Sequence, residues 1–237
     1  MQVEVFDSKQ AVARALSDHL KTWCRQEGFR SVALSGGSTP KIWFDLLADE
    51  YAETLPWKDL LFFWGDERCV PPGDPESNYR MTREHLLEKV PVPKDHVFRI
   101  CGESAPAEES RRYGQVLKEH LPDPNGIPSF DLVVLGMGDD GHTASIFPHQ
   151  MALWDAEQPC VVATHPQSGQ KRISITGKVI NNARQVVFLV TGANKAARIR
   201  QIHQQLPGFE NLPASRVAPG SGRLLWMLDA AAASDLS

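Results

Sequence analysis

The sequence of 237 residues contains no long apolar run, no excess of basic residues and only four cysteines. No run approaches the ~18 apolar residues of a membrane span, and the first ten residues lack the basic and apolar regions of a signal peptide. With a formal net charge of −4, the chain is not expected to bind nucleic acid or an anionic membrane. The scattered cysteines predict neither a zinc ribbon nor a disulfide framework. We therefore expect a cytoplasmic protein with reduced thiols.

Apolar strands and amphipathic helices alternate along almost the whole chain. Hydrophobic residues make up 42% and charged residues 23%, a balance that supports a buried core. The predicted strands are Val3–Phe6, Ser31–Ser35, Leu60–Gly65, Val97–Ile100, 131–136, 185–192 and 224–228. The predicted helices are Lys9–Glu27, Pro40–Ala48, Asn78–Lys89, Glu108–His120 and Lys195–Gln205, with caps at Ser8 and Ser77 and a stop at Gly28.

Strands of this kind, bracketed by helices, predict an α/β fold with a mostly parallel sheet covered by helices on both faces. The segment Arg172–Val190 is a weaker candidate for an antiparallel addition. No linker is long enough to divide the chain, so we expect a single domain over residues 1–237. In such sheets, ligands bind where the carboxyl ends of strands meet loops and helix N-termini.

The segment Ser35–Pro40, SGGSTP, joins a predicted strand to a predicted helix. Its adjacent glycines let the backbone approach a ligand closely, with successive N–H groups on one side of the turn. We expect Ser38 or Thr39 to cap the helix and the proline to take its first position. The helix start and the two hydroxyls suit a phosphate. The alternative is an ordinary turn, because the spacing matches neither the nucleotide P-loop nor the dinucleotide fingerprint.

Two further strand ends carry charged residues. Asp66 and Glu67 follow one strand and would alternate in direction, so at most one should face a site, whereas Arg68 could clamp a phosphate or carboxylate. A local salt-bridged surface loop is the alternative. Lys195 lies at a predicted helix start, where the helix dipole disfavours a cation. A bound anion beside it would explain a lysine at this position. The alternative is a solvated lysine at a helix start. Arg172 is a third candidate cation, with the weakest positional argument.

His142 lies in the loop after the strand DLVVLG, in the segment GMGDDGHTASIFP. An ordinary imidazole titrates near ~6.5, which suits a general base at neutral pH. Asp140 is close enough in sequence to orient it, and three glycines keep the loop compact. The alternative is a structural histidine in a turn. Four strand-end loops together predict a phosphate-anchored site with proton-transfer chemistry, and the spacings of histidine and acids give no metal motif.

Together these segments resemble the 6-phosphogluconolactonase family, whose fold group includes glucosamine-6-phosphate deaminase and ribose-5-phosphate isomerase. The segments are, in chain order, VALSGGSTP, GDERCVPPGDPESNYRM, LVVLGMGDDGHTASIFP, RISIT, VFLVTGANKA and PASRV. The resemblance spans nearly the whole chain. It implies a three-layer αβα sandwich with a Rossmann-like sheet. It also implies hydrolysis of 6-phospho-D-glucono-1,5-lactone to 6-phosphogluconate in the oxidative pentose phosphate pathway, with no metal or organic cofactor.

The resemblance also implies roles for individual residues. His142 is the implied base that activates water against the lactone carbonyl, and Asp140 and Asp66 are implied in the same pocket. Arg68 is an implied substrate clamp. The implied phosphate site consists of Gly36, Gly37, Ser38 and Thr39, together with Lys195 and Arg172. We expect the oxyanion donors to be N–H groups of the loop from Gly138 to Gly141, and the protein to be a monomer or a weak homodimer.

The sequence departs from the family pattern at one position, and two alternative functions remain to be distinguished. The family usually has glycine after Pro148, where this chain has His149, so we expect an altered loop shape and unchanged chemistry. An amino-sugar phosphate deaminase or isomerase usually continues its histidine turn with Asn-Glu-Pro, whereas residues 143–148 contain no carboxylate. A non-catalytic sugar-phosphate sensor could dispense with His142 while keeping SGGSTP and Lys195.

Overall fold

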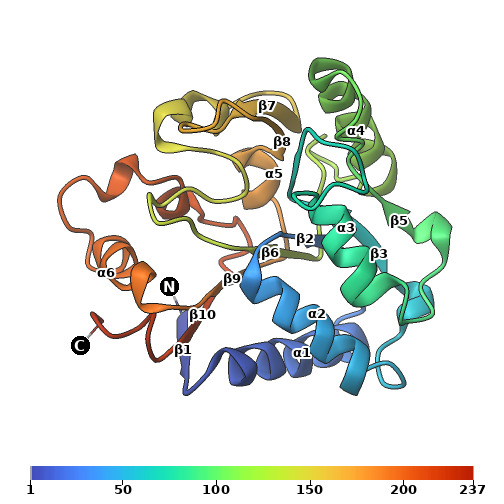
Figure 1. Ribbon diagram of the computed structural model, residues 1–237, viewed down its shortest axis with the longest axis horizontal. Helices are drawn as coiled ribbons and strands as arrows, with labels where there is room; N and C mark the ends of the chain where they lie inside the picture. The colour runs from blue at the N-terminus through green and yellow to red at the C-terminus, as the bar shows by residue number, and fades with distance from the viewer. Residues whose placement is uncertain (1, 237) are drawn as a thin grey trace.

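A computed structural model describes residues 2–236 of the chain. Its main sheet has seven strands in the order β1-β10-β9-β6-β2-β3-β5, and every neighbouring pair is parallel (Figure 1). The strands are β1 (Gln2–Phe6), β2 (Ser31–Leu34), β3 (Leu61–Trp64), β5 (Val97–Phe98), β6 (Leu132–Leu135), β9 (Gln185–Val190) and β10 (Leu224–Asp229). The central strands are buried, so the predicted parallel sheet is confirmed.

Helices cover both faces of this sheet. They are α1 (Lys9–Gln26), α2 (Ser38–Glu50), α3 (Asn78–Thr82), α4 (Pro106–His120), α5 (Gly177–Asn181) and α6 (Ala196–His203). Figure 1 shows α1 and α2 on one side of the sheet and α4 and α5 on the other, which confirms the αβα prediction. Ser8 caps α1 by accepting a hydrogen bond from the Ala11 N–H at 3.2 Å, and Gly28 follows the helix at φ +68°.

Helix α2 begins earlier than the sequence predicts. Its N-cap is Gly37 at φ +113°, a backbone conformation that glycine adopts without strain, and no side chain caps the helix. The expected capping roles of Ser38 and Thr39 are therefore wrong, since both residues lie inside the first turn. Pro40 is tolerated as the third helical residue because N–H groups of the first turn have no partner within the helix.

Two other predicted helices are divided. The segment 78–89 begins as α3, capped by Ser77, whose Oγ accepts from the Arg80 N–H at 3.1 Å, and continues as a π-helical turn over Arg83–Leu87. The segment 195–205 becomes α6 preceded by a 3₁₀ turn, Ala193–Lys195, so Lys195 lies at the N-terminal boundary of the helix.

A second sheet projects above the main one. It contains β4 (Asp66–Arg68), β8 (Lys171–Ile175) and β7 (Cys160–Thr164), all antiparallel. Strand β8 confirms the antiparallel addition, whereas 185–190 belongs to the parallel sheet. Gly65 joins the sheets: its N–H donates to the Leu34 carbonyl at 2.8 Å, and its carbonyl accepts from Ile175 at 2.9 Å.

The strands β9, β6, β2 and β3 are neighbours in the main sheet. Because all four are parallel, their carboxyl ends lie on the same side, and the loops after them carry the candidate residues. The sheet thus gathers segments that are far apart in the sequence. Within residues 2–236, no helix combines the length and apolarity needed to cross a membrane.

Candidate active site

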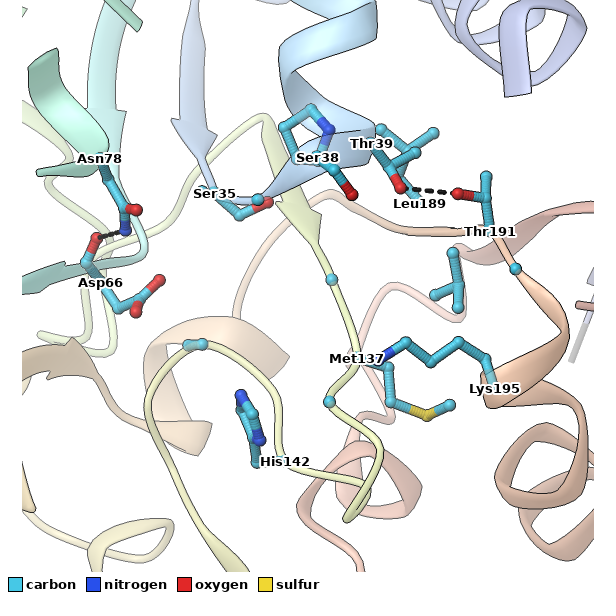
Figure 2. Close-up of a pocket in the computed structure, with 18 of the residues that line it drawn as sticks. Ser35, Ser38, Thr39, Asp66, Asn78, Met137, His142, Leu189, Thr191 and Lys195 are labelled. Atoms are coloured by element: carbon cyan, nitrogen blue, oxygen red, sulfur yellow. Dashed lines mark hydrogen bonds between the residues drawn. The ribbon is translucent and has the colours of Figure 1, made fainter. Parts of the chain in front are cut away.

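A cavity of about 360 Å³ lies at the carboxyl ends of these four strands (Figure 2). Ten of the predicted site residues line it: Gly36, Gly37, Ser38, Thr39, Asp66, Arg68, Gly138, His142, Arg172 and Lys195. Asp140 does not line the cavity but contacts His142. Residues that the sequence analysis did not select also line it, among them Ser35, Asn78, Thr191 and Asn194.

The His142 ring is fixed by the adjacent carboxylate. Its Nδ1 lies 2.6 Å from Asp140 Oδ1, and the same oxygen accepts the His142 backbone N–H at 3.1 Å. Burial opposes ionisation of Asp140, but its hydrogen bonds to His142 and the nearby imidazole lower its pKa to about 2. An ionised carboxylate only accepts hydrogen bonds, so it selects the tautomer that carries its proton on Nδ1. That tautomer leaves the lone pair of Nε2 available to remove a proton from water.

Gly138 makes room for this pair. A Cβ atom at position 138 would lie 2.1 Å from His142 Nδ1 and 2.8 Å from Asp140 Oδ1, closer than side-chain atoms can approach. The Gly138 N–H donates to the His142 carbonyl at 2.9 Å, and the Gly141 N–H donates to the Gly138 carbonyl at 3.0 Å. These two N–H groups hold the loop together, so neither of them is free to be one of the oxyanion donors that we expected from this loop.

The hydroxyl groups of the turn after β2 differ in their exposure to the cavity. Ser38 is exposed at the cavity, whereas Thr39 is buried and its Oγ1 lies 2.7 Å from Thr191 Oγ1 in the loop after β9 (Figure 2). Ser35 Oγ is buried without a hydrogen-bond partner among residues 2–236. The turn therefore offers an exposed hydroxyl and the N–H groups at the start of α2 to a ligand.

Asn78 connects the glycine turn to the second sheet. Its side-chain oxygen would lie 1.8 Å from a Cβ at position 36, so Gly36 has no room for any side chain. Its Nδ2 donates to the Asp66 carbonyl at 2.9 Å. The sequence predicts the start of a helix at this position but no contact with the site, because the partner segments lie more than ten residues away in the chain.

Asp66 faces the cavity and Glu67 faces away from it, as the alternation predicts. Asp66 is 6% exposed, and its Oδ2 accepts a hydrogen bond from the Ser145 hydroxyl at 2.5 Å. Glu67 is buried and accepts the backbone N–H groups of Asn78 and Tyr79, each at 2.8 Å. Burial raises the pKa of Glu67. Both carboxylates are thus buried, and the surface-loop alternative is wrong for them.

Two arginines share the other wall of the cavity. Arg68 on β4 and Arg172 on β8 are direct partners in the antiparallel pair. Burial and the neighbouring Arg68 charge lower the pKa of Arg172, while Arg68 Nε is buried without a hydrogen-bond partner among residues 2–236. Like charges directly opposite each other destabilise a sheet, and an anion between them would offset this repulsion.

Lys195 approaches the cavity from the start of α6. Its ammonium forms an ion pair with Asp139, and Asn194 Nδ2 donates to the same carboxylate oxygen at 2.8 Å. The Lys195 side chain is 18% exposed, whereas that of Asp139 is 68% exposed. An anionic ligand would therefore compete with a solvent-exposed carboxylate for this cation.

The cavity thus combines a histidine with a defined tautomer and four cationic residues, Lys9, Arg68, Arg172 and Lys195. Within residues 2–236, no cluster of three or more His, Cys, Asp or Glu side chains is arranged to hold a metal ion. The arrangement suits proton removal from water beside an anchored anionic ligand.

Comparison with known proteins agrees with this geometry. Residues 6–226 match the family described as glucosamine-6-phosphate isomerases/6-phosphogluconolactonase. A 6-phosphogluconolactonase of Treponema pallidum is 48% identical, with 82% of this chain and 81% of that protein covered. A 6-phosphogluconolactonase of Nostoc sp. is 40% identical over 99% of this chain and 98% of its own length. The crystal structure of a protein named devB has a TM-score of 0.93 at 42% identity, covering 100% and 99% of the two chains. The chain therefore belongs to the glucosamine-6-phosphate isomerase/6-phosphogluconolactonase family.

Proposed function

We propose that this protein hydrolyses 6-phospho-D-glucono-1,5-lactone to 6-phosphogluconate, with His142 as the general base. The observation that carries the proposal is the 2.6 Å contact between His142 Nδ1 and Asp140, made on the wall of a cavity that also holds Arg68, Arg172 and Lys195. The names of the relatives support the substrate.

In the proposed reaction, the phosphate binds at the turn of residues 36–39 beside Lys195 and Arg172. His142 Nε2 takes a proton from water as the water oxygen attacks the lactone carbonyl. The bond between the carbonyl carbon and the ring oxygen then breaks as the imidazolium returns the proton to the ring oxygen, which stays tethered to the sugar as a hydroxyl. No covalent nucleophile is needed, because a lactone of this kind already opens in water without a catalyst. Base catalysis typically accelerates such steps about 10²–10⁴-fold, and anchoring the phosphate adds a positional advantage.

Negative charge develops on the carbonyl oxygen as water attacks. Since the N–H groups of Gly138 and Gly141 are used within their own loop, we propose Arg68 as the donor to this oxygen. Its guanidinium lines the cavity, and among residues 2–236 its hydrogen bond is made by Nη1, which donates to the Glu76 carbonyl. A charged donor in a partly buried site stabilises such an oxyanion strongly.

Isomerisation or deamination of an amino-sugar phosphate is the principal rival. That class usually supplies a further carboxylate from an Asn-Glu-Pro element after the histidine to assist ring opening, and residues 143–148, which follow Asp140 and His142, contain no carboxylate. Ser145 in this segment instead binds Asp66 through its hydroxyl. These observations favour lactone hydrolysis over aldose–ketose chemistry.

The test is hydrolysis of the phosphorylated lactone, followed above its spontaneous rate of opening in water. We expect rapid turnover of this lactone and none of glucosamine 6-phosphate. Binding without turnover would favour a sensor, and turnover of the amino sugar would favour the rival enzyme. We further propose that the chain acts as a single domain in the cytoplasm, as a monomer or a weak homodimer, without a cofactor.

A further inference from the structure

Phe147 is a fully buried residue whose surroundings are unusually polar. It ends the loop that carries His142, and its side chain is 0% exposed. Buried phenylalanines usually pack among other apolar side chains. Phe147 lies outside the main hydrophobic core cluster, to which Ile146, its neighbour in sequence, belongs. Filling of the hydrophobic core therefore does not explain why an aromatic ring occupies this position.

The ring packs directly against the proposed base. The ring centroids of Phe147 and His142 are 4.7 Å apart, and the two planes are inclined at 48°. Among residues 2–236, one side-chain hydrogen bond, from Nδ1 to Asp140, holds the imidazole at one corner. The absence of a side chain at Gly138 leaves space for Nδ1 and Cε1 of the imidazole, but Gly138 has no side chain that could hold the ring in place. Phe147 supplies a rigid surface that restricts rotation of the imidazole about its attachment.

The same ring also contacts the second sheet. The guanidinium carbon of Arg172 on β8 lies 5.7 Å from its centroid, a cation–π distance. His165, in the turn between β7 and β8, meets it edge-on at 5.4 Å, and His149 lies at 5.9 Å. The loop carrying the base is also tied to this sheet by Ser145, whose N–H donates to Ser174 Oγ at 3.1 Å.

We infer that Phe147 is a positioning residue, which holds the His142 imidazole at a fixed angle and distance from Arg172. The inference rests on the proposed function, because it requires His142 as the base and Arg172 as a ligand of the phosphate. Water must be deprotonated at one end of a substrate that is anchored at the other, so the separation between base and cation sets the rate. One ring that touches both groups fixes that separation.

The test compares Phe147→Leu with Phe147→Tyr. Leucine keeps an apolar group but removes the flat ring, so we expect kcat to fall by about tenfold or more on the phosphorylated lactone. We expect a smaller fall on the unphosphorylated gluconolactone, because without a phosphate the separation between His142 and Arg172 does not position the substrate. Tyrosine keeps the ring, and we expect its kcat to stay within about threefold of wild type.

Phe188→Leu is the matched control. Phe188 is also 0% exposed, but it stacks on Trp226 and belongs to the main core cluster. We expect this variant to unfold at lower temperature with kcat unchanged at a temperature where it is folded.

The possible outcomes separate the two proposals. A wild-type kcat in Phe147→Leu would overturn the positioning role. Equal losses in Phe147→Leu and Phe188→Leu, or in the leucine and tyrosine variants, would do the same. If the wild-type protein itself fails to hydrolyse the lactone, the proposed function fails first.

Discussion

Arg68 and Arg172 lie directly opposite each other across strands β4 and β8. Facing like charges destabilise an antiparallel pair by roughly 0.2–1 kcal/mol, and the lowered pKa of Arg172, due to its burial and to Arg68, reflects this strain. A cost of this kind is typical of a binding site, where residues are selected for the ligand and not for the stability of the free protein.

Arg172→Met should therefore stabilise the protein while weakening its ligand binding. Methionine keeps much of the apolar stem of the side chain but removes the repulsion from Arg68, so we expect the free energy of unfolding to rise by up to about 1 kcal/mol. Affinity for 6-phosphogluconate should fall by about tenfold or more, since a charge-assisted contact is lost. Thermal unfolding and calorimetric titration measure the two effects. Lower thermal stability combined with unchanged affinity would contradict both expectations.

Gly138→Ala should inactivate the enzyme with little loss of structure. The added Cβ would overlap His142 Nδ1 at 2.1 Å, so the imidazole and its carboxylate partner must move apart. We expect kcat to fall by about 10²-fold. Gly73→Ala is the control, because a Cβ there meets nothing within 4 Å, and its activity should match wild type. Full activity in Gly138→Ala would show that the observed placement of the histidine is not needed for turnover.

Asp140→Asn should disturb the tautomer of His142. An amide can donate a hydrogen bond to Nδ1 and thereby place the imidazole proton on Nε2, which can then no longer accept one from water. We expect kcat to fall by roughly 10²–10⁴-fold. The KM for the phosphorylated lactone should change much less, because Asp140 does not line the cavity. A rise in KM with an unchanged kcat would argue against this role.

Comparison of the wild type with Asp140→Asn also tests how the free energy of unfolding depends on pH. The pKa of Asp140 falls from an ordinary 3.8 to about 2 in the folded protein, so its ionised form favours folding. This stabilisation is complete above pH 3.8 and is lost as the pH falls towards about 2. The difference in urea midpoint between the wild type and Asp140→Asn should therefore shrink over that interval. A constant difference would show that the carboxylate contributes nothing through its charge.

Lys195 and Asp139 should have opposite effects on ligand affinity. Lys195→Ala removes a cation from the cavity, and we expect about tenfold weaker binding of 6-phosphogluconate, with little effect on an unphosphorylated lactone. Asp139→Asn removes the carboxylate that competes for the same ammonium, so binding should strengthen a few-fold, about what an exposed ion pair contributes. Lys178→Ala, remote from the cavity, is the control. Equal losses of affinity for 6-phosphogluconate and for the unphosphorylated lactone in Lys195→Ala would contradict a phosphate role.

The sequence predicts the main sheet well because buried parallel strands are continuous apolar runs. Segments such as LVVL and QVVFLV are recognisable without any knowledge of their neighbours. The four loops that follow β2, β3, β6 and β9 could be grouped for the same reason, since parallel strands place their carboxyl ends together. Family resemblance then implied roles that composition alone could not.

The short strands and long-range contacts were not predictable in this way. β4 has three residues and polar character, and β7 alternates only partly between buried and half-buried positions, so neither gives a strong periodic signal. The contact of Asn78 with Gly36 and the packing of Phe147 against His142 depend on how the chain folds in three dimensions. The start of α2 was misplaced because the positive φ of Gly37 is set by tertiary structure.

The direct test of His142 as the base is to measure turnover and binding separately in His142→Ala. We expect lactone hydrolysis to fall to the spontaneous rate, while 6-phosphogluconate binds within about tenfold of wild type, a difference below ~1.4 kcal/mol. That result would separate the chemistry at the imidazole from the anchoring of the phosphate. Retained hydrolysis in His142→Ala would exclude this histidine as the group that activates water.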